Sequence, residues 1–221
     1  MDLNKFFTKV ASQYDKLAAI LTLGLDKSLL REAVKESNLG KKHAKVLDVA
    51  TGTGRVAMAI AKGYPGYNVI GIDLNSNMLA NAIKKSRNIK NVDYLIGNVE
   101  SLSFESSYFD IVASAFSLGI FSDLEKAIKE MHRVLKPKGK IILIDMLKPK
   151  DSVLNKIVDL YYSINVIPAL DARLKKDVLA YVRSLKVDKD YVIEELKRAG
   201  FRSIKEKDFA GGLAFVITAI K

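Results

Sequence analysis

Two glycines that follow an apolar run are the residues of this chain best suited to bind a ligand through the backbone. The run from Val46 to Ala50 is typical of a buried parallel strand, and it breaks into a Gly52-Thr53-Gly54 turn. Glycine has no Cβ, so the backbone of this turn can approach a ligand closely. A helical pattern begins at residue 56, which places strand, turn and helix N-terminus around the crevice where open α/β sheets bind ligands. The turn therefore predicts a nucleotide-like cofactor in that crevice.

A carboxylate at the end of the next apolar segment fits the same cofactor. That segment runs from Val69 to Ile72 and leads directly into Asp73. Its two oxygens can accept hydrogen bonds from both hydroxyls of a ribose. A glycine turn with such an acid occurs in proteins that bind NAD and in proteins that bind S-adenosylmethionine, so these two features leave both cofactors open.

The elements that must hold these residues alternate between strands and helices. Apolar segments and helical patterns follow one another between residues 44 and 146, which predicts a parallel sheet with right-handed crossovers. Ser122 and Glu125 predict a capping box for the helix that carries Met131. Two amphipathic helices are predicted before this core, the first across Phe6 to Leu17.

The C-terminal third of the chain departs from this alternation. Helical pieces interrupt it after residue 148, and the alternating segments Phe201 to Phe209 and Leu213 to Ile220 predict a closing hairpin. The length of 221 residues suits a single domain over 1–221. Its predicted parts are an N-terminal helical cap (1–40), a cofactor-binding core (44–146), a helical substrate lid (148–189), and a C-terminal helix with the hairpin (190–221).

Composition limits the classes of partner. The chain has 36 Lys and Arg against 25 Asp and Glu, and this charge of +11 would attract acidic partners such as RNA, anionic lipid or phosphorylated metabolites. It has no cysteine, which excludes disulfides and thiol ligands, and we expect no metal site. No segment reaches the ~20 apolar residues of a membrane span, and the first residues lack the apolar region of a signal peptide. We therefore expect a cytoplasmic protein.

Several short motifs occur in a characteristic order and spacing. They are Val46–Gly54, Asp73 with Asn75–Leu79, Asn98–Phe104, Arg133–Gly139 and Asp145 with Lys148-Pro149, flanked by Val10–Asp15 near the start and Ala199-Gly200-Phe201 near the end. Together they resemble class I S-adenosylmethionine-dependent methyltransferases, and within these the ubiquinone/menaquinone-biosynthesis C-methyltransferase family. The resemblance covers nearly the whole chain. It implies a Rossmann-like α/β fold with a seven-stranded, mostly parallel sheet, helices on both faces and a C-terminal antiparallel hairpin.

The resemblance also implies a role for individual residues. Gly52, Thr53 and Gly54 would face the methionine part of S-adenosylmethionine, and Asp73 would bind its ribose. A plain structural role stays open for several of them, such as a solvated strand-end carboxylate for Asp73. The other implied contacts are Leu74 and Met78 at the adenine face, Asn98 and Val99 at the adenine edge, Tyr14 from the cap, and Ala50, Ala115 and Phe116.

The chain departs from the family where the acceptor would bind. Arg55 follows the glycine turn where the family usually has an acid, and Asn165 replaces a family histidine, so that imidazole is absent. The segment Ala115 to Gly119 likewise lacks polar residues of the family pattern. The candidates for a catalytic group are Tyr162, Asp145 and Asp171, and their spacing singles out none of them.

An uncharged run in the predicted lid indicates the kind of acceptor. Leu160 to Leu170 is too short to span a bilayer, so it either packs on the core or forms the apolar wall of a pocket. As a wall it favours a small lipophilic aromatic or quinol-like acceptor, methylated on carbon or oxygen. Lys148, Lys150 and Lys156 would rest the mouth of the site on an anionic membrane surface.

Two other functions are compatible with the sequence. One is a non-catalytic partner subunit that binds S-adenosylmethionine, since no general base stands out. The other is an RNA methyltransferase that uses the basic residues near Lys84 and Lys136. RNA is the less favoured acceptor because no aromatic residues alternate with these lysines to stack bases.

Overall fold

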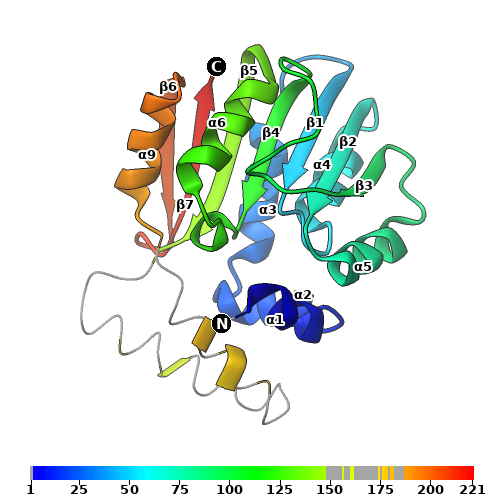
Figure 1. The fold of residues 1–221 in the computed structure, drawn as a ribbon, viewed down its shortest axis with the longest axis vertical. Coiled ribbons are helices and arrows are strands. Elements are labelled where there is room, and N and C mark those ends of the chain that lie inside the picture. The colour runs from blue at the N-terminus through cyan, green and yellow to red at the C-terminus, as the bar shows by residue number, and fades with distance from the viewer. Residues whose placement is uncertain are drawn as a thin grey trace.

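A single seven-stranded sheet runs through the computed structural model (Figure 1), which describes residues 2–147, 156, 160–161, 174, 176–178, 180–181 and 187–221. The order across the sheet is β3-β2-β1-β4-β5-β7-β6. The strands are β1 (Ala44–Val49), β2 (Tyr67–Asp73), β3 (Val92–Ile96), β4 (Phe109–Ala115), β5 (Leu135–Met146), β6 (Arg202–Phe209) and β7 (Ala214–Ile220).

Strand direction decides where a ligand can bind. The five strands β1 to β5 are parallel to one another, whereas β7 is antiparallel to both β5 and β6. The predicted mostly parallel sheet with a C-terminal hairpin is therefore confirmed. Strand order reverses between β1 and β4, and the C-terminal ends of the parallel strands meet at one edge, where open α/β sheets form their ligand crevice.

Helices cover both faces of the sheet, as predicted (Figure 1). Helices α3 and α4 pack on one face and α6 and α9 on the other, each layer closing its own apolar core. Buried aliphatic strand residues fill both cores because parallel strands covered on two faces have no solvated side. The helices are α1 (Leu3–Val10), α2 (Tyr14–Leu21), α3 (Asp26–Glu36), α4 (Arg55–Gly63), α5 (Ser76–Ser86), α6 (Leu124–Val134) and α9 (Lys189–Arg198), with a short 3₁₀ turn η1 (Leu118–Ile120).

The N-terminal cap has three helices rather than the two predicted. The apolar pattern from Phe6 to Leu17 continues across a break after Val10, so it is divided between α1 and α2. Helical spacing alone does not reveal such a break, because the apolar residues of both helices pack into the same cluster. Helices α1 and α2 lie beyond the C-terminal ends of the parallel strands (Figure 1), over the expected crevice.

The predicted capping box at the start of α6 is wrong. Asp123 is the N-cap residue, and its side chain accepts a hydrogen bond from the N–H of Lys126. Glu100, from the loop after β3, accepts from the N–H groups of Ser122 and Asp123 at 2.8 and 3.0 Å. A distant carboxylate therefore satisfies donors that the sequence pattern assigns to a local one.

Within the described part of the chain, no helix is long and apolar enough to cross a membrane. The same residues contain no group of three or more histidine, aspartate or glutamate side chains that could hold a metal ion.

Candidate cofactor site

The turn after β1 adopts a conformation that requires its glycines. Gly52 and Gly54 have φ angles of 56° and 78°, in the left-handed region that glycine adopts without strain. A Cβ at Gly54 would lie 2.5 Å from the Tyr94 hydroxyl oxygen and 2.9 Å from the Cβ of Ala82. Gly54 is thus needed for packing beneath the turn, which brings the backbone at Gly52 to the crevice.

A buried carboxylate holds the turn from below. Asp48 near the end of β1 accepts hydrogen bonds from the Thr51 hydroxyl at 2.5 Å and from the Ala57 N–H at 3.0 Å. Burial raises the pKa of Asp48 to about 7, although both hydrogen bonds act in the opposite direction. Asp48 therefore fixes the end of the strand relative to the first turn of α4.

Asp73, at the end of β2, is held with both oxygens at the crevice. Its Oδ2 accepts from the Gly52 N–H and its Oδ1 from the Asn75 N–H, each at 2.8 Å. Burial raises the pKa of Asp73, and these backbone donors oppose the increase. Each oxygen can accept further hydrogen bonds, so the oriented carboxylate suits a ribose diol.

The predicted residues gather around one pocket of about 240 Å³. Every residue predicted to contact the cofactor lines it except Thr53, which lines a smaller adjoining cavity, and Gly54, which lies in the turn. Ala50 follows β1 and Phe116 follows β4, the two neighbouring strands between which the strand order reverses. Their φ angles are 52° and 59°. Non-glycine residues seldom adopt this conformation, and such strain is often found at functional sites. Ten further residues line the pocket without having been predicted as cofactor contacts: Leu3, Asn4 and Phe7 in α1, Asn75 before α5, Gly97 and Glu100 after β3, and Ser117, Ile120, Phe121 and Ser122 after β4.

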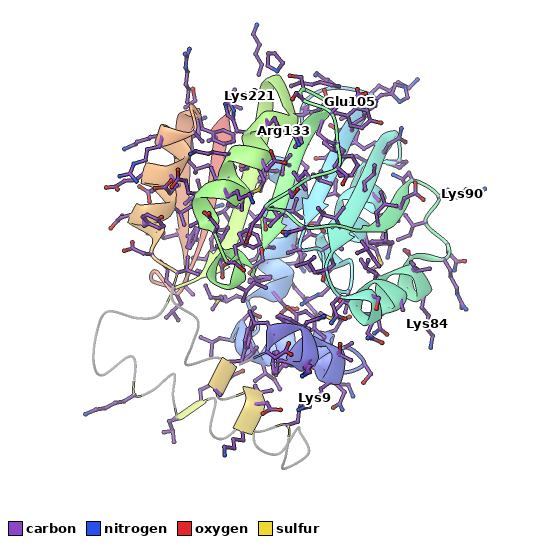
Figure 2. All side chains as sticks on the ribbon, in the orientation of Figure 1. Lys9, Lys84, Lys90, Glu105, Arg133 and Lys221 are labelled. Atoms are coloured by element: carbon purple, nitrogen blue, oxygen red, sulfur yellow. The ribbon has the colours of Figure 1, made fainter. Side chains whose placement is uncertain are left out.

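The loop that carries Asn98 is clamped by α6. Glu130 accepts from the Leu102 N–H at 2.8 Å, and Arg133 (Figure 2) donates to the carbonyls of Leu102 and Phe104 at 2.9 and 2.8 Å. Arg133 therefore does not line the pocket itself, but it holds the loop that forms one wall of the pocket.

Hydrogen bonds fasten the cap to the same crevice. The Asn75 side-chain amide donates to the Asn4 carbonyl, the Asn4 Oδ1 and the Thr8 hydroxyl at 3.0, 2.6 and 2.9 Å. At the other end, the Thr53 hydroxyl donates to Asp15 of α2 at 2.6 Å. Both attachment points adjoin predicted cofactor contacts, so cap position and pocket shape are linked. The motif after Asp73 includes Asn75, but nothing in the sequence indicates its contact with α1.

The catalytic candidates remain predictions. Asp145 is buried near the end of β5, where it accepts from the N–H groups of Leu118 and Met146 at 2.9 and 2.7 Å, and burial raises its pKa to about 7. It lies behind the turn after β4 and does not line the pocket. Tyr162 and Asp171 lie outside the described residues.

The described pocket fits S-adenosylmethionine in the chemistry of its groups. It offers a glycine turn, an oriented carboxylate for the ribose, and apolar side chains such as Leu74, Met78 and Val99 for a flat ring. Solved structures that share this fold include methyltransferases. A possible histamine N-methyltransferase from Thermotoga maritima superposes with a TM-score of 0.71 at 19% identity, over 98% of this chain and 99% of that one. Phosphoethanolamine N-methyltransferase 2 from Haemonchus contortus, solved with S-adenosyl-L-methionine, gives 0.67 at 19% identity, over 88% of this chain and 52% of that one.

Fold and site together define a class I S-adenosylmethionine-dependent methyltransferase. Sequence comparison places it more closely. The family model of the ubiE/COQ5 methyltransferase family matches residues 2–221, and the chain belongs to this family. It is 37% identical to a demethylmenaquinone methyltransferase of Chlorobaculum tepidum, over 81% of this chain and 73% of that protein. It is 31% identical to the ubiquinone/menaquinone biosynthesis C-methyltransferase UbiE of Rickettsia prowazekii, over 99% of this chain and 92% of that protein.

Proposed function

We propose that this enzyme methylates a ring carbon of a lipophilic quinol-type acceptor. Two relatives named for menaquinone or ubiquinone chemistry support a quinone-type ring. The observation that carries the lipophilic part is an apolar, aromatic cluster beside the cofactor pocket.

That cluster joins the cap to the segment after β5. Phe7 and Ile120 line the pocket and also pack against a buried group that contains Phe6 of α1 together with Val178 and Tyr181. The ring of Tyr181 stacks on Phe6 with centroids 4.7 Å apart and meets Phe7 edge to face at 5.6 Å. Such a wall offers dispersion contacts to an aromatic ring and few hydrogen bonds to a sugar or a free amino acid.

The main task of the protein in methyl transfer is to orient the acceptor relative to the methyl group. Bound S-adenosylmethionine supplies an electrophilic methyl group, and a carbon–carbon bond forms as the methyl–sulfur bond breaks. Holding the acceptor carbon in line with that bond is an effect that reaches ~7–11 kcal/mol in favourable models. The ring then loses a proton, and the three candidate acceptors are Tyr162, Asp171 and Asp145, of which Asp145 has a pKa raised by burial to about 7 but does not line the pocket.

Labelled methyl transfer tests this proposal. The enzyme is incubated with methyl-labelled S-adenosylmethionine and either a reduced demethylated prenyl quinol or a polar metabolite extract, and we expect label in the quinol. Phe7→Ala should lower kcat/KM for the quinol by about tenfold or more, since a truncated aromatic commonly loses more than ~1.4 kcal/mol of contact. Phe209→Ala, at the end of the outer strand β6, is the matched control. Label that enters only polar metabolites, or equal losses in the two variants, would contradict the proposal.

The same assay decides between this proposal and a non-catalytic subunit. An enzyme that binds S-adenosylmethionine but transfers label to no small molecule or macromolecule would be a binding module.

The basic residues give RNA little support. Lys84 and Lys90 point outward (Figure 2), while Lys85 and Lys136 are occupied in ion pairs with carboxylates. Lys136 stands at the start of β5, at the opposite end of the sheet from the pocket. The two groups therefore do not form one groove leading to the site.

Peripheral contact with an anionic bilayer belongs to the same proposal, because a prenyl quinol resides in membranes. Lys156 is exposed, and Lys148 and Lys150 lie outside the described residues. Co-sedimentation with anionic vesicles but not with neutral ones is the expected result.

A further inference from the structure

A second, smaller cavity continues the cofactor pocket past the glycine turn. Its volume is about 30 Å³, and it shares Tyr14, Ala50, Gly52, Ala115 and Phe116 with the main pocket. Beyond these shared residues it reaches Thr53 and the start of α4. A ligand that fills the main pocket can therefore extend a short chain into this cavity.

Two side chains of opposite charge line the small cavity. Asp48 forms part of its floor, and Arg55, the first residue of α4, forms part of its wall. The N-terminus of α4 adds the partial positive charge of a helix end. An α-amino acid carries one ammonium and one carboxylate, so the guanidinium of Arg55 complements its carboxylate, and the carboxyl group of Asp48 can accept a hydrogen bond from its ammonium.

Arg55 is held in place from outside the cavity. Its Nη2 forms an ion pair with Asp26, whose side chain is only 6% exposed. None of the other residues that the structure describes accepts a hydrogen bond from its remaining N–H groups. The guanidinium is thus partly paired yet retains donors that can bind a second anion in the cavity.

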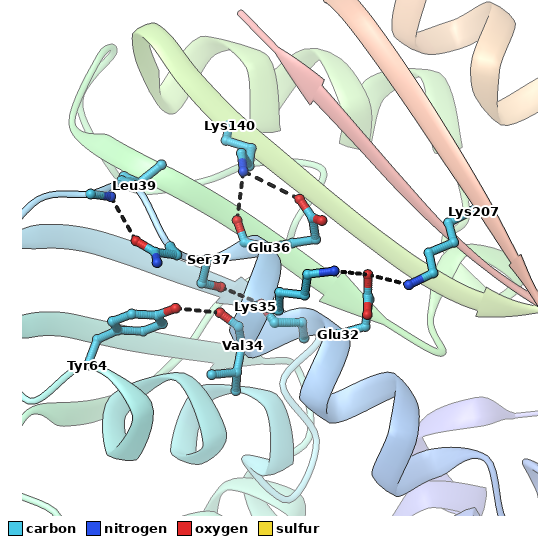
Figure 3. Close-up of polar contacts among 12 residues, drawn as sticks. Glu32, Val34, Lys35, Glu36, Ser37, Leu39, Tyr64, Lys140 and Lys207 are labelled. Atoms are coloured by element: carbon cyan, nitrogen blue, oxygen red, sulfur yellow. Dashed lines mark hydrogen bonds and ion pairs between the residues drawn. The ribbon is translucent and has the colours of Figure 1, made fainter.

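The helix that carries Asp26 is itself rigidly attached (Figure 3). Lys207 of β6 pairs with Glu32 at 2.9 Å, and Lys140 of β5 donates to the Glu36 carbonyl at 2.8 Å. Because α3 is fixed to the sheet, Asp26 provides a firm support for Arg55.

We propose that Arg55 binds the carboxylate of the methionine part of S-adenosylmethionine within the small cavity. At this position the family usually has an acid, so the role would distinguish this chain within its family. The inference rests on S-adenosylmethionine as cofactor and not on the identity of the acceptor.

The alternative is that Arg55 only joins α3 to α4. Ligands that differ at the carboxylate separate the two roles, because a structural pair would affect all of them alike. S-Adenosylmethionine carries the carboxylate, decarboxylated S-adenosylmethionine lacks only that group, and 5′-methylthioadenosine lacks the whole amino acid tail.

The test is calorimetric titration of wild type and Arg55→Met with these three ligands. Methionine keeps much of the volume and removes the charge. We expect the variant to bind S-adenosylmethionine at least tenfold more weakly and 5′-methylthioadenosine within twofold of wild type. Wild type should prefer S-adenosylmethionine over its decarboxylated form, and the variant should lose most of that preference.

Two controls keep the outcome clear. Arg55→Lys retains the positive charge but lacks the planar set of N–H donors, so it should recover part of the preference for S-adenosylmethionine over its decarboxylated form. The same variant replaces Arg55→Met in the comparison if Arg55→Met does not fold. Equal weakening for all three ligands, or no weakening for any, would overturn the proposal. If wild type binds no S-adenosylmethionine, the fault lies with the cofactor assignment and the role of Arg55 falls with it.

Discussion

Three aspartates at or near the C-terminal ends of β1, β2 and β5 give the crevice its character. Asp48, Asp73 and Asp145 are largely withdrawn from water, and burial raises the pKa of each. Their described hydrogen-bond donors are backbone N–H groups and one hydroxyl, with no cation in direct contact. Such carboxylates destabilise the fold when ionised, so their positions favour function over stability.

Asp145 offers a pH test of this view. Its pKa rises from 3.8 to about 7 on folding, so between these values the folded state holds a proton that the unfolded state has lost. Ionisation of the unfolded state therefore lowers the free energy of unfolding as pH rises from 3.8 to about 7. Asp145→Asn removes that loss, and the unfolding free energy of the variant relative to wild type should rise with pH by up to ~1.4 kcal/mol per unit. Denaturant unfolding from pH 4 to pH 7 measures it.

Asp110 provides a control with the opposite sign. Burial would raise its pKa, but hydrogen bonds from Lys136, the Lys45 N–H and Lys41 lower it below the value of 3.8. Its stabilising contribution is present above 3.8 and is lost as pH falls below that value. In unfolding measurements extended below pH 3.8, Asp110→Asn should therefore lose stability relative to wild type as pH rises to 3.8, and its profile should stay flat between pH 4 and pH 7. A flat profile for Asp145→Asn would show that its carboxyl ionises alike in both states.

Residue-level prediction from the sequence was strongest where local chemistry restricts the choice. Gly52 and Asp73 follow from the glycine turn and the strand end, and the structure brings them into hydrogen-bond contact at 2.8 Å. Asn4 and Glu100 were missed because they act across more than twenty residues of sequence, through geometry that no local pattern records.

At the scale of elements, helices α1 and α2 are the part of the cap most open to movement, since α3 is fixed to the sheet. Helices α1 and α2 contact the rest of the described structure through a few side-chain hydrogen bonds and one apolar cluster, while the strands share continuous ladders. Segments with few such contacts open at lower free energy than the core. The cap can therefore open for ligand entry without unfolding the sheet.

Asn75 separates cap docking from helix capping. Its Oδ1 accepts from the N–H groups of Asn77 and Met78 and so caps α5, while its Nδ2 donates to α1. Asn75→Asp keeps the acceptor and removes the donor, so hydrogen exchange should quicken in α1 and stay unchanged in α5. Asn75→Ala should quicken exchange in both helices, by about fivefold or more for ~1 kcal/mol of lost capping. Unchanged exchange of α1 in both variants would show that the apolar cluster alone holds the cap.

At the scale of the whole molecule, the alternation of strands and helices was enough to predict the fold. The closing hairpin was predicted from two alternating segments, and Gly211 and Gly212, in the turn between β6 and β7, have φ angles of 68° and 90°. The break between α1 and α2 was not predicted, because an unbroken apolar face does not reveal where the helix ends. The predicted domain boundaries and the catalytic role of Tyr162 stay predictions.

The central claim is that the cofactor binds at the C-terminal edge of this sheet, with its ribose on Asp73. Calorimetric titration with S-adenosylmethionine tests it most directly, in wild type, Asp73→Ala and the exposed Asp93→Asn on the neighbouring strand. Each charge-assisted hydrogen bond is worth ~1.5–3 kcal/mol, so Asp73→Ala should weaken binding by about tenfold or more, whereas wild type and Asp93→Asn should bind one equivalent alike. Equal affinity for Asp73→Ala and wild type, or no binding by wild type, would contradict the account.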